Sequence, residues 1–248
     1  MKRLLLTGVT ALALACAERY DPANDPNLDP PVRPIPNVDA IPGVQCETND
    51  GLMRRVVLAN GTEFCIDVFE ASLDGGNRGN AFQATLDTSD ATDGSTTAAA
   101  VVGLQAQPAA GVSFYQAKAA CENAGKRLCT QDEWERACRG PQALLYPYGD
   151  SVEEKACNGF FNYAESNPLL TGSLDTCGSD FGIYDMSGNL SEWTSTRAER
   201  LPGSGVFNDR AVRGGSFQGN NVALRCVGEE YRDAPFNAPE DRGFRCCL

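Results

Sequence analysis

Cysteine is the residue type best suited to chemistry in this sequence, because the 248-residue chain has eleven cysteines and no histidine. Without histidine, a Ser-His-Asp triad, a Cys-His nucleophile and an imidazole-ligated metal centre are excluded. A zinc site would need Cys-x-x-Cys pairs or histidines, and the chain has neither. The cysteines therefore point to disulfide bonds rather than to a zinc cluster or a histidine-based enzyme.

Ten of the cysteines form an even set once Cys16, which closes the N-terminal segment, is set aside. The set consists of Cys46, Cys65, Cys121, Cys129, Cys138, Cys157, Cys177, Cys226, Cys246 and Cys247. In an oxidising compartment, an even number of cysteines predicts five bridges. Each bridge would stabilise the fold by about 2–4 kcal/mol, mainly by restricting the unfolded chain.

The charge and hydropathy of the chain exclude two further classes of protein. It has 21 Lys and Arg against 33 Asp and Glu, a formal net charge of −12. Nucleic-acid binding needs basic residues that neutralise phosphates, so no nucleic-acid partner is expected. No continuous apolar stretch reaches the roughly 20 residues that span a bilayer, so an integral membrane protein is not expected either.

The N-terminus has the pattern of an export signal. Lys2 and Arg3 form a basic start, Leu4–Ala15 is mostly apolar but too short for a membrane helix, and Cys16 follows. This resembles the signal of bacterial lipoproteins, in which the cysteine is lipidated and begins the mature chain; ordinary cleavage before a free Cys16 is the alternative. We expect residues 1–16 to be such a signal. The mature protein would then lie in the bacterial cell envelope, on the periplasmic or cell-surface face, and touch the membrane through its lipid alone.

Composition divides the rest of the chain into a tether and a domain. Residues 17–45 hold seven of the fourteen prolines and few apolar residues, so we expect a disordered tether. Residues 46–248 are expected to form the folded domain. Within it, residues 74–100 are rich in Gly, Asp, Ser, Thr and Ala, which is typical of a solvated surface insertion.

Local patterns predict a hairpin at the start of the domain. Apolar runs at 55–58 and 64–69 flank Asn60-Gly61, a pair that readily adopts the left-handed backbone of a tight turn. Cys46 and Cys65 bracket this unit and are expected to clasp it.

Two capping boxes predict two helices. Ser113 is followed by Gln116, and Thr130 is followed by Glu133, each three residues later. The first helix should stop at Gly125 and the second at Gly140-Pro141.

Beyond Pro141 no long helical period remains. Short strand-like pieces at 181–184 and 211–213 alternate with Gly- and Asn-rich turns. The pattern alone therefore predicts an irregular α+β fold.

Four segments, in this order, carry a family resemblance. They are Gly111–Ala117 continued through Gly125–Ala137; Tyr146-Pro-Tyr-Gly149; Tyr184–Thr194 with its Asp-Met-Ser-Gly-Asn; and Val212-Arg-Gly-Gly-Ser-Phe217 with Gly243-Phe-Arg-Cys246. The chain from about residue 60 to 248 resembles the formylglycine-generating enzyme, or sulfatase-modifying factor, family. The resemblance implies a compact, mostly irregular α+β fold related to C-type lectins.

The resemblance also shows what this chain lacks. True formylglycine-generating enzymes hold copper between two cysteines that follow the Gly-Gly-Ser block, since thiolates suit Cu(I). Here Gly219 stands where the first of these cysteines would fall, and no cysteine stands at the second. Cys226 matches a structural cysteine of the family instead. No copper and no catalytic residue are therefore expected.

The family pattern implies how the cysteines pair. Carried over, it gives Cys121–Cys246 and Cys138–Cys226. Of the rest, Cys46–Cys65 clasps the hairpin, and Cys157–Cys177 and Cys129–Cys247 are the expected pairs of the remaining four.

A structural calcium ion is also implied by the resemblance. Its ligands would be the side chains of Asp185 and Glu192 and the backbone carbonyls of Gly188 and Leu190, while Asn158 matches the first ligand of a second family site. Calcium accepts six to eight oxygen ligands of mixed type, so these residues suit it. A turn role for the aspartate and a surface role for the glutamate are the alternatives.

Two hypotheses for function follow. The first is a surface-anchored, non-catalytic protein that binds a protein, peptide or glycan ligand or serves as a scaffold; the second is an enzyme with altered oxidative or peptide-modifying chemistry. Arg213, Arg242 and Arg245 would suit a ligand carboxylate, although internal ion pairs are the simpler explanation for them. Trp134 and Trp193 are expected in the core. The binding hypothesis is the one we favour.

Overall fold

The structure is a computed structural model that describes residues 46, 52–74, 98–159, 167–198, 209–228 and 231–248. All of these residues belong to one unit, Arg33–Leu248. The expected signal peptide and tether, residues 1–45, lie outside the described residues. No helix in the described part of the chain is long and apolar enough to cross a membrane.

The predicted hairpin opens the domain. Strands β1 (Met53–Val57) and β2 (Glu63–Asp67) pair antiparallel. In the turn between them, Gly61 has a φ of +85° and donates its N–H to the carbonyl of Leu58 at 2.9 Å. Glycine adopts this left-handed backbone without a steric cost, which confirms the Asn-Gly turn.

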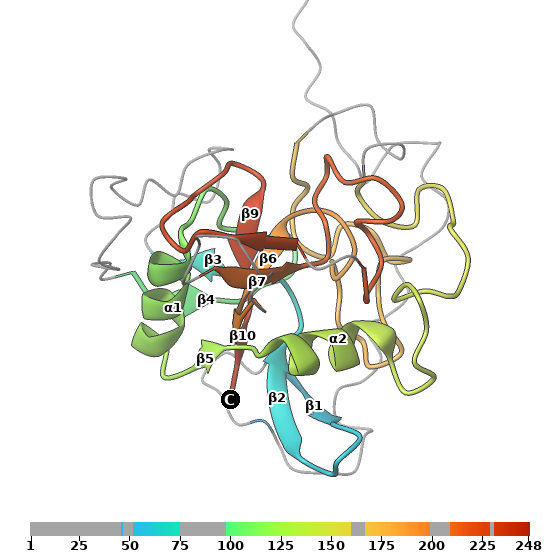
Figure 1. The fold of residues 1–248 in the computed structure, drawn as a ribbon, viewed down its shortest axis with the longest axis horizontal. Coiled ribbons are helices and arrows are strands. Elements are labelled where there is room, and N and C mark those ends of the chain that lie inside the picture. The colour runs from blue at the N-terminus through green and yellow to red at the C-terminus, as the bar shows by residue number, and fades with distance from the viewer. Residues whose placement is uncertain (1–45, 47–51, 75–97, 160–166, 199–208, 229–230) are drawn as a thin grey trace, which may run out of the picture. The chain divides into compact units, whose positions relative to one another are not determined.

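The end of the chain completes the first sheet. Strand β10 (Cys246–Cys247) lies antiparallel between β2 and β5 (Arg127–Leu128), and the sheet order is β1-β2-β10-β5 (Figure 1). The C-terminus thus joins the N-terminal hairpin to the segment between the two helices.

Both expected helices form, and both begin with their capping boxes. Helix α1 spans Phe114–Asn123 and α2 spans Gln131–Arg139. The hydroxyls of Ser113 and Thr130 each accept a hydrogen bond from the backbone N–H three residues later. In return, the side chain of that later residue, Gln116 or Glu133, accepts from the backbone N–H of the capping residue. After α2, Gly140 has a φ of +65°, which ends the helix where the sequence predicts.

A second sheet lies above the first and carries the site described below. Its order is β8-β7-β6-β9, formed by β6 (Ser191–Arg197), β7 (Arg210–Arg213), β8 (Tyr231–Asp233) and β9 (Arg242–Phe244). β6 pairs antiparallel with β7 and parallel with β9. The strand predicted at 211–213 is therefore confirmed within β7.

The other strand-like piece, 181–184, does not form a strand. Tyr184 makes an isolated bridge to Gly178, and Ile183 is completely buried. The apolar side chains of this piece pack into the core, but its backbone does not form the repeated hydrogen bonds of a strand. The apolar pattern therefore indicates burial and not a strand.

The two ends of the expected insertion at 74–100 are held together by a pair of short strands. β3 (Ser72–Leu73) and β4 (Ala100–Val101) pair antiparallel, and the N–H of Ala99 donates to the carboxylate of Asp74 at 2.6 Å. Residues 75–97 lie outside the described residues.

Two apolar clusters make up the core. One gathers around α1 and includes Trp193, Phe244 and the Cys121–Cys246 pair; the other gathers around α2 and includes Trp134 and Met186. Both tryptophans are essentially inaccessible, which confirms that they are core residues.

Candidate functional site

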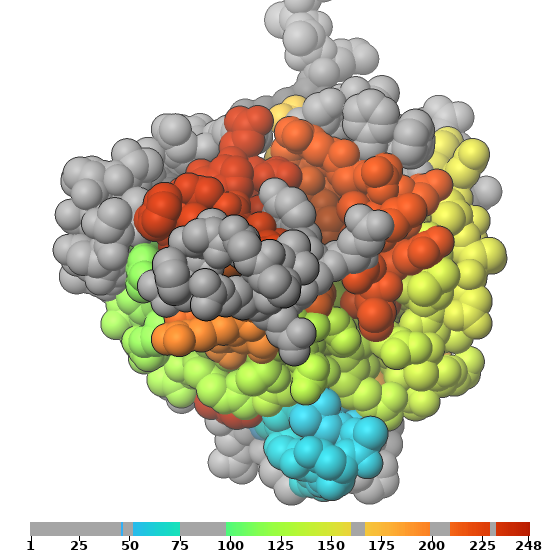
Figure 2. All heavy atoms as spheres, in the orientation of Figure 1, coloured from blue at the N-terminus to red at the C-terminus, as the bar shows by residue number. Residues whose placement is uncertain are grey.

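A cleft of about 660 Å³ opens where β7 runs into the loop that follows it. It is lined by residues 212–216, 218–220, 222, 223 and 225, together with Ser191 of β6 and Asp241, which precedes β9. On the face drawn in Figure 2, the orange and red atoms of residues 209–228 lie beside the yellow-green atoms of the segment after α2. Two hydrogen bonds join these segments: Cys226 N–H to the Leu145 carbonyl at 2.9 Å, and Tyr146 Oη to the Asn221 carbonyl at 2.9 Å.

The loop of the cleft is built on glycines that approach other backbone atoms closely. Gly215 has a φ of +63°, and a Cβ there would lie 2.8 Å from the carbonyl oxygen of Ala223. At Gly219 a Cβ would lie 2.9 Å from the carbonyl oxygen of Ser216, whose carbonyl accepts the Gly219 N–H at 2.7 Å. A side chain at either position therefore requires the backbone to move.

Side-chain hydrogen bonds tie this loop to β6 and β9. Ser216 Oγ donates to Asp241 Oδ2 at 2.7 Å and accepts from the Gln218 N–H at 3.2 Å. Ser191 Oγ donates to the Asp241 carbonyl at 2.9 Å and accepts from Arg242 Nε at 2.8 Å. Ser191, Ser216 and Asp241 thus form a connected network of largely buried polar groups in the lining of the cleft.

The Asp-Met-Ser-Gly-Asn block lies directly beneath the loop. Gly188 N–H donates to the Gly214 carbonyl at 2.9 Å, and Phe217 N–H donates to the Asn189 carbonyl at 2.9 Å. Gly188 has a φ of +80°, and a Cβ there would lie 2.1 Å from the carbonyl oxygen of Asn158. Only glycine lets the three segments approach this closely, so the block sets the position of the cleft loop.

A fully buried ion pair joins Glu192 of β6 to Arg245, the residue between β9 and β10. Arg245 Nε and Nη2 donate to both oxygens of Glu192, at 2.7 Å and 2.6 Å for the closest contacts. Trp134 Nε1 donates to the same carboxylate at 2.7 Å. The Glu192 carboxylate opposite the guanidinium raises the pKa of Arg245 despite its burial.

Two further carboxylates lie in the same buried region. Glu70 accepts from the Leu190 N–H at 2.8 Å and Asp185 accepts from the Gly172 N–H at 2.7 Å. Burial raises the pKa of Glu70 well above its usual value, and the nearby Asp185 and Glu192 charges add to the effect. Burial also raises the pKa of Asp185 to about 6, although Gly172 and Arg245 oppose the shift.

The expected calcium ligands lie around this region, but their side chains are engaged differently from a calcium shell. Asn158 Oδ1 is buried and has no hydrogen-bond partner in the described part of the chain, so it offers an oxygen. Both oxygens of Glu192 are taken by Arg245 and Trp134, so that carboxylate does not fit the role without sharing. Among the residues that the structure describes, no three acidic or cysteine side chains converge as a metal site. Calcium binding through Asp185, Gly188, Leu190 and Glu192, and at a second site that begins at Asn158, stays a prediction.

The three arginines that suit a ligand carboxylate all have internal partners. Arg245 pairs with Glu192, Arg213 Nε lies 2.9 Å from Glu135, and Arg242 lies 3.3 Å from Asp233. Internal ion pairs therefore explain these residues.

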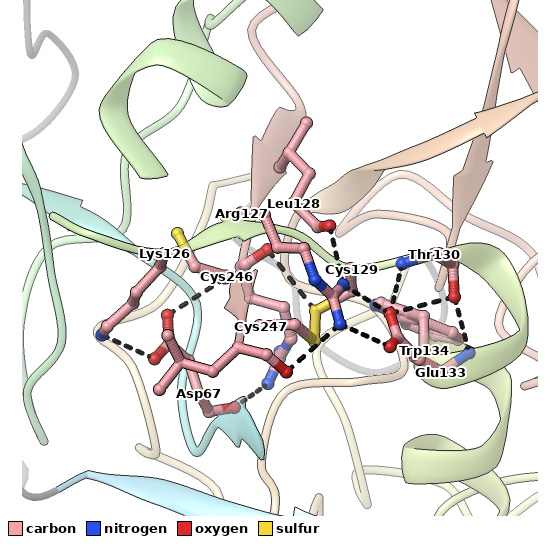
Figure 3. The surroundings of a disulfide bond; sticks show 12 residues. Asp67, Lys126, Arg127, Leu128, Cys129, Thr130, Glu133, Trp134, Cys246 and Cys247 are labelled. Carbon is pink, nitrogen blue, oxygen red and sulfur yellow. Dashed lines mark hydrogen bonds and ion pairs between the residues drawn. A yellow bond between two sulfur atoms is a disulfide. The ribbon is translucent and has the colours of Figure 1, made fainter. Parts of the chain in front are cut away.

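All five expected disulfides are confirmed. The bonded pairs are Cys46–Cys65, Cys121–Cys246, Cys129–Cys247, Cys138–Cys226 and Cys157–Cys177. Figure 3 shows one of them, Cys129–Cys247, between the Asp67–Lys126 ion pair and a bidentate pair of Arg127 with Glu133. Five bridges indicate an oxidising, extracytoplasmic environment.

The chemistry that this cleft can perform follows from its lining. Every cysteine from Cys46 onward is in a disulfide, so no thiolate faces the cleft. Ser216 has a carboxylate beside it, but no lysine or cysteine is among the lining residues. Hydroxyl, amide and guanidinium groups on a fixed backbone suit hydrogen-bonded recognition of a ligand.

Sequence reasoning missed several residues of this region. Glu70 follows the apolar run of β2, and an acidic residue in that position was the one signal of a buried charge. Arg225 gave no signal, because its importance depends on which charges the fold places beside it.

A family model supports the resemblance over the whole domain. The model described as "Sulfatase-modifying factor enzyme 1-like domain" matches residues 48–248.

Curated relatives of known name match a shorter stretch. The chain is 32% identical over 164 residues to "Formylglycine-generating enzyme" of Mus musculus, covering 56% of this chain and 43% of that protein. It is 29% identical over 158 residues to "Inactive C-alpha-formylglycine-generating enzyme 2" of Bos taurus, covering 56% and 49%. It is 31% identical over 159 residues to "Serine/threonine-protein kinase pkn1" of Chlamydia caviae, covering 58% and 24%. The chain thus spans between a quarter and a half of the length of these relatives.

A solved structure shares the fold. "Treponema denticola variable protein 1" superposes with a TM-score of 0.61 at 19% identity, covering 79% of this chain and 94% of that one. At this identity the likeness shows the fold alone, which is the irregular, disulfide-stapled α+β architecture.

Proposed function

The chain belongs to the sulfatase-modifying factor family, and from this premise we propose that it is a non-catalytic binding protein. Its ligand, a protein, peptide or glycan, would occupy the cleft formed by β7 and its following loop. Export and a lipid on Cys16 would hold the domain at the bacterial cell envelope, with residues 17–45 as the tether.

The observation that carries this proposal is that the cleft is formed but has no free cysteine that could bind copper among the described residues that line it. Gly219 replaces the first copper cysteine, and the tight contact with Ser216 leaves no room there for a side chain. The cysteine nearest along the chain, Cys226, is bonded to Cys138. The recognition surface is therefore retained while the thiolates that would bind the metal are missing.

Other observations support the same conclusion. One curated relative bears the name of an inactive formylglycine-generating enzyme, so loss of the reaction has a precedent among similar proteins. The disulfides fit an exported protein, as the N-terminal pattern predicts.

Two valines offer a matched test of binding. Val222 lines the cleft and is 43% exposed, whereas Val152 is 42% exposed and lies outside it. We would select phage-displayed peptides, and in parallel probe a glycan array, with the oxidised domain. Binders that are retained by Val152→Trp and lost with Val222→Trp are expected. A set of binders insensitive to Val222→Trp, or none at all, would overturn the proposal.

A second measurement tests the absence of the reaction. The purified domain is loaded with Cu(I), analysed for metal and incubated with a sulfatase-motif peptide under oxygen. We expect neither stoichiometric copper nor formylglycine in the peptide by mass spectrometry. Copper bound in the cleft together with turnover would identify an enzyme.

A further inference from the structure

Three charged side chains line the cleft, and they differ in the partners that the protein provides for them. Arg213 is held by Glu135 at 2.9 Å. Asp241 accepts a hydrogen bond from Ser216. Arg225 has no acidic partner among the residues that the structure describes, which makes its guanidinium the cation available to a ligand.

Arg225 also carries a donor that the protein leaves unsatisfied. Its Nε is buried and has no hydrogen-bond partner in the described part of the chain. A buried donor without a partner costs about 1–3 kcal/mol, and more when it belongs to a charged group. An acceptor that reaches this Nε–H from the cleft would remove the cost, which favours binding of an anion at Arg225.

The backbone of Arg225 is held in place before any ligand arrives. The neighbouring Leu224 and Cys226 are buried, and the cysteine is bonded to Cys138 of α2. Arg225 N–H donates to the Val222 carbonyl at 3.3 Å. A backbone held in this way keeps the guanidinium at the cleft before a ligand arrives, which favours its use in recognition.

We propose that Arg225 binds a carboxylate of an acidic peptide in the cleft, an inference that rests on the proposed binding function. Guanidinium and carboxylate match as planar, bidentate partners. A singly charged carboxylate suits the site better than a phosphate. Asp241 lines the same cleft, and an acidic residue there repels a doubly charged ligand more strongly than a singly charged one.

The rest of the lining favours a peptide over an acidic sugar. No aromatic ring, on which a sugar ring would stack, is among the lining residues. The exposed side-chain amide of Gln218 and the side-chain NH₂ group of Asn220 instead offer groups that pair with a peptide backbone.

The test uses one peptide and its neutral counterpart. The probe is acetylated and amidated Gly-Gly-Glu-Gly-Gly, and the control has glutamine in place of glutamate. Both are titrated into the ¹⁵N-labelled domain, with NMR shifts read at the Arg225 Nε–H and at the cleft amides. We expect the glutamate peptide to bind at least about tenfold more tightly, the gain of one good charge-assisted pair.

Variants show whether Arg225 is responsible. Arg225→Gln should reduce the preference for glutamate to less than about twofold, whereas Arg197→Gln, the same charge change at an exposed position outside the cleft, should retain it. Arg225→Lys keeps the charge without the planar fork and should give an intermediate preference. It also provides the answer if Arg225→Gln does not fold.

Each outcome decides the inference. Equal binding of both peptides in the cleft, or a glutamate preference that survives in Arg225→Gln, overturns it and leaves the binding function intact. Absence of either peptide from the cleft also overturns it, and the selection with Val222→Trp then judges the binding function separately. Tighter binding of glucuronate than of the glutamate peptide would assign the cleft to acidic sugars.

Discussion

Arg245 and Glu192 illustrate how strongly one buried pair can hold this domain. Both side chains are fully buried. Besides pairing with Glu192 of β6, the guanidinium donates to the carbonyl of Tyr184 at 2.9 Å, so it joins two segments of the chain. Taking two charges out of water is costly, and their close pairing repays that cost only while both partners are present.

Removal of one partner should therefore destabilise the domain strongly. Glu192→Gln leaves the Arg245 charge without its partner, and we expect a loss of about 3 kcal/mol in the free energy of unfolding. Glu122→Gln, which breaks the exposed Lys118–Glu122 pair on α1, should cost no more than about 1 kcal/mol. Urea unfolding of the oxidised variants measures both, and equal losses would contradict this role of the buried pair.

The raised pKa of Asp185 makes stability depend on pH in a defined direction. The folded state holds a proton on this carboxyl up to about pH 6, whereas the unfolded chain releases it near pH 4. Between these values the folded state binds more protons, so its stability falls as the pH rises. The contribution lost between pH 5 and 7 is about 1 kcal/mol.

Asp185→Asn should flatten this part of the pH profile. Asparagine can accept from the Gly172 N–H and tolerates the φ of +61° at this position. Unfolding free energies at pH 5, 6 and 7, measured with a chelator present, should show a smaller decrease than in the parent. The exposed Asp180→Asn serves as control and should keep the parent slope; a flattening in both variants would contradict the assignment.

At the scale of elements, the helices depend on their caps. Ser113 is buried and accepts from the Gln116 N–H at 3.3 Å, while the Gln116 side chain accepts from the Ser113 N–H at 2.9 Å. This reciprocal arrangement satisfies two backbone donors that the helix cannot satisfy itself.

Ser113→Ala should destabilise the domain by about 1 kcal/mol through loss of the cap. The comparison is Ser151→Ala at an exposed position, which should change the unfolding free energy by less than about 0.5 kcal/mol. Denaturation midpoints at constant slope report both values. A Ser113→Ala variant as stable as the control would show that the cap contributes nothing.

Local elements were predictable because their signals are local. The two caps and the Asn60-Gly61 turn each depend on residues only a few positions apart, and all three formed where expected. The piece at 181–184 failed because its apolar residues report burial, which a buried loop satisfies as well as a strand. The parallel pairing of β6 with β9 joins residues about fifty positions apart and had no local signal.

The candidate site was predictable only in part, for the same reason. Gly219 stands where the family resemblance places the first copper cysteine, and this is visible in the sequence itself. By contrast, the pairing of Arg245 with Glu192 and the lack of a partner at Arg225 depend on which charges the finished fold brings together. The family resemblance implied a calcium ligand at Glu192, and no local signal indicated that this carboxylate also pairs with Arg245.

At the scale of the whole molecule, the calcium prediction is open to a direct test. If calcium binds at the site of Asp185 and Glu192 or at the second site of Asn158, a chelator should lower the melting temperature of the oxidised domain, and added calcium should restore it. Asn158→Ala should remove the part of this response that the second site contributes, even though the variant also loses hydrogen bonds and melts lower at the outset. A parent melting temperature that ignores both chelator and calcium would contradict the prediction.

The bridges also determine how the domain responds to proteases. Cys121–Cys246 and Cys129–Cys247 span the chain from α1 to its last strand, and Cys138–Cys226 lies within that span. A single backbone cut anywhere inside the span leaves both fragments covalently attached, so a nicked molecule runs intact on a gel until it is reduced. Damage of this kind would sever the polypeptide without releasing either wall of the cleft.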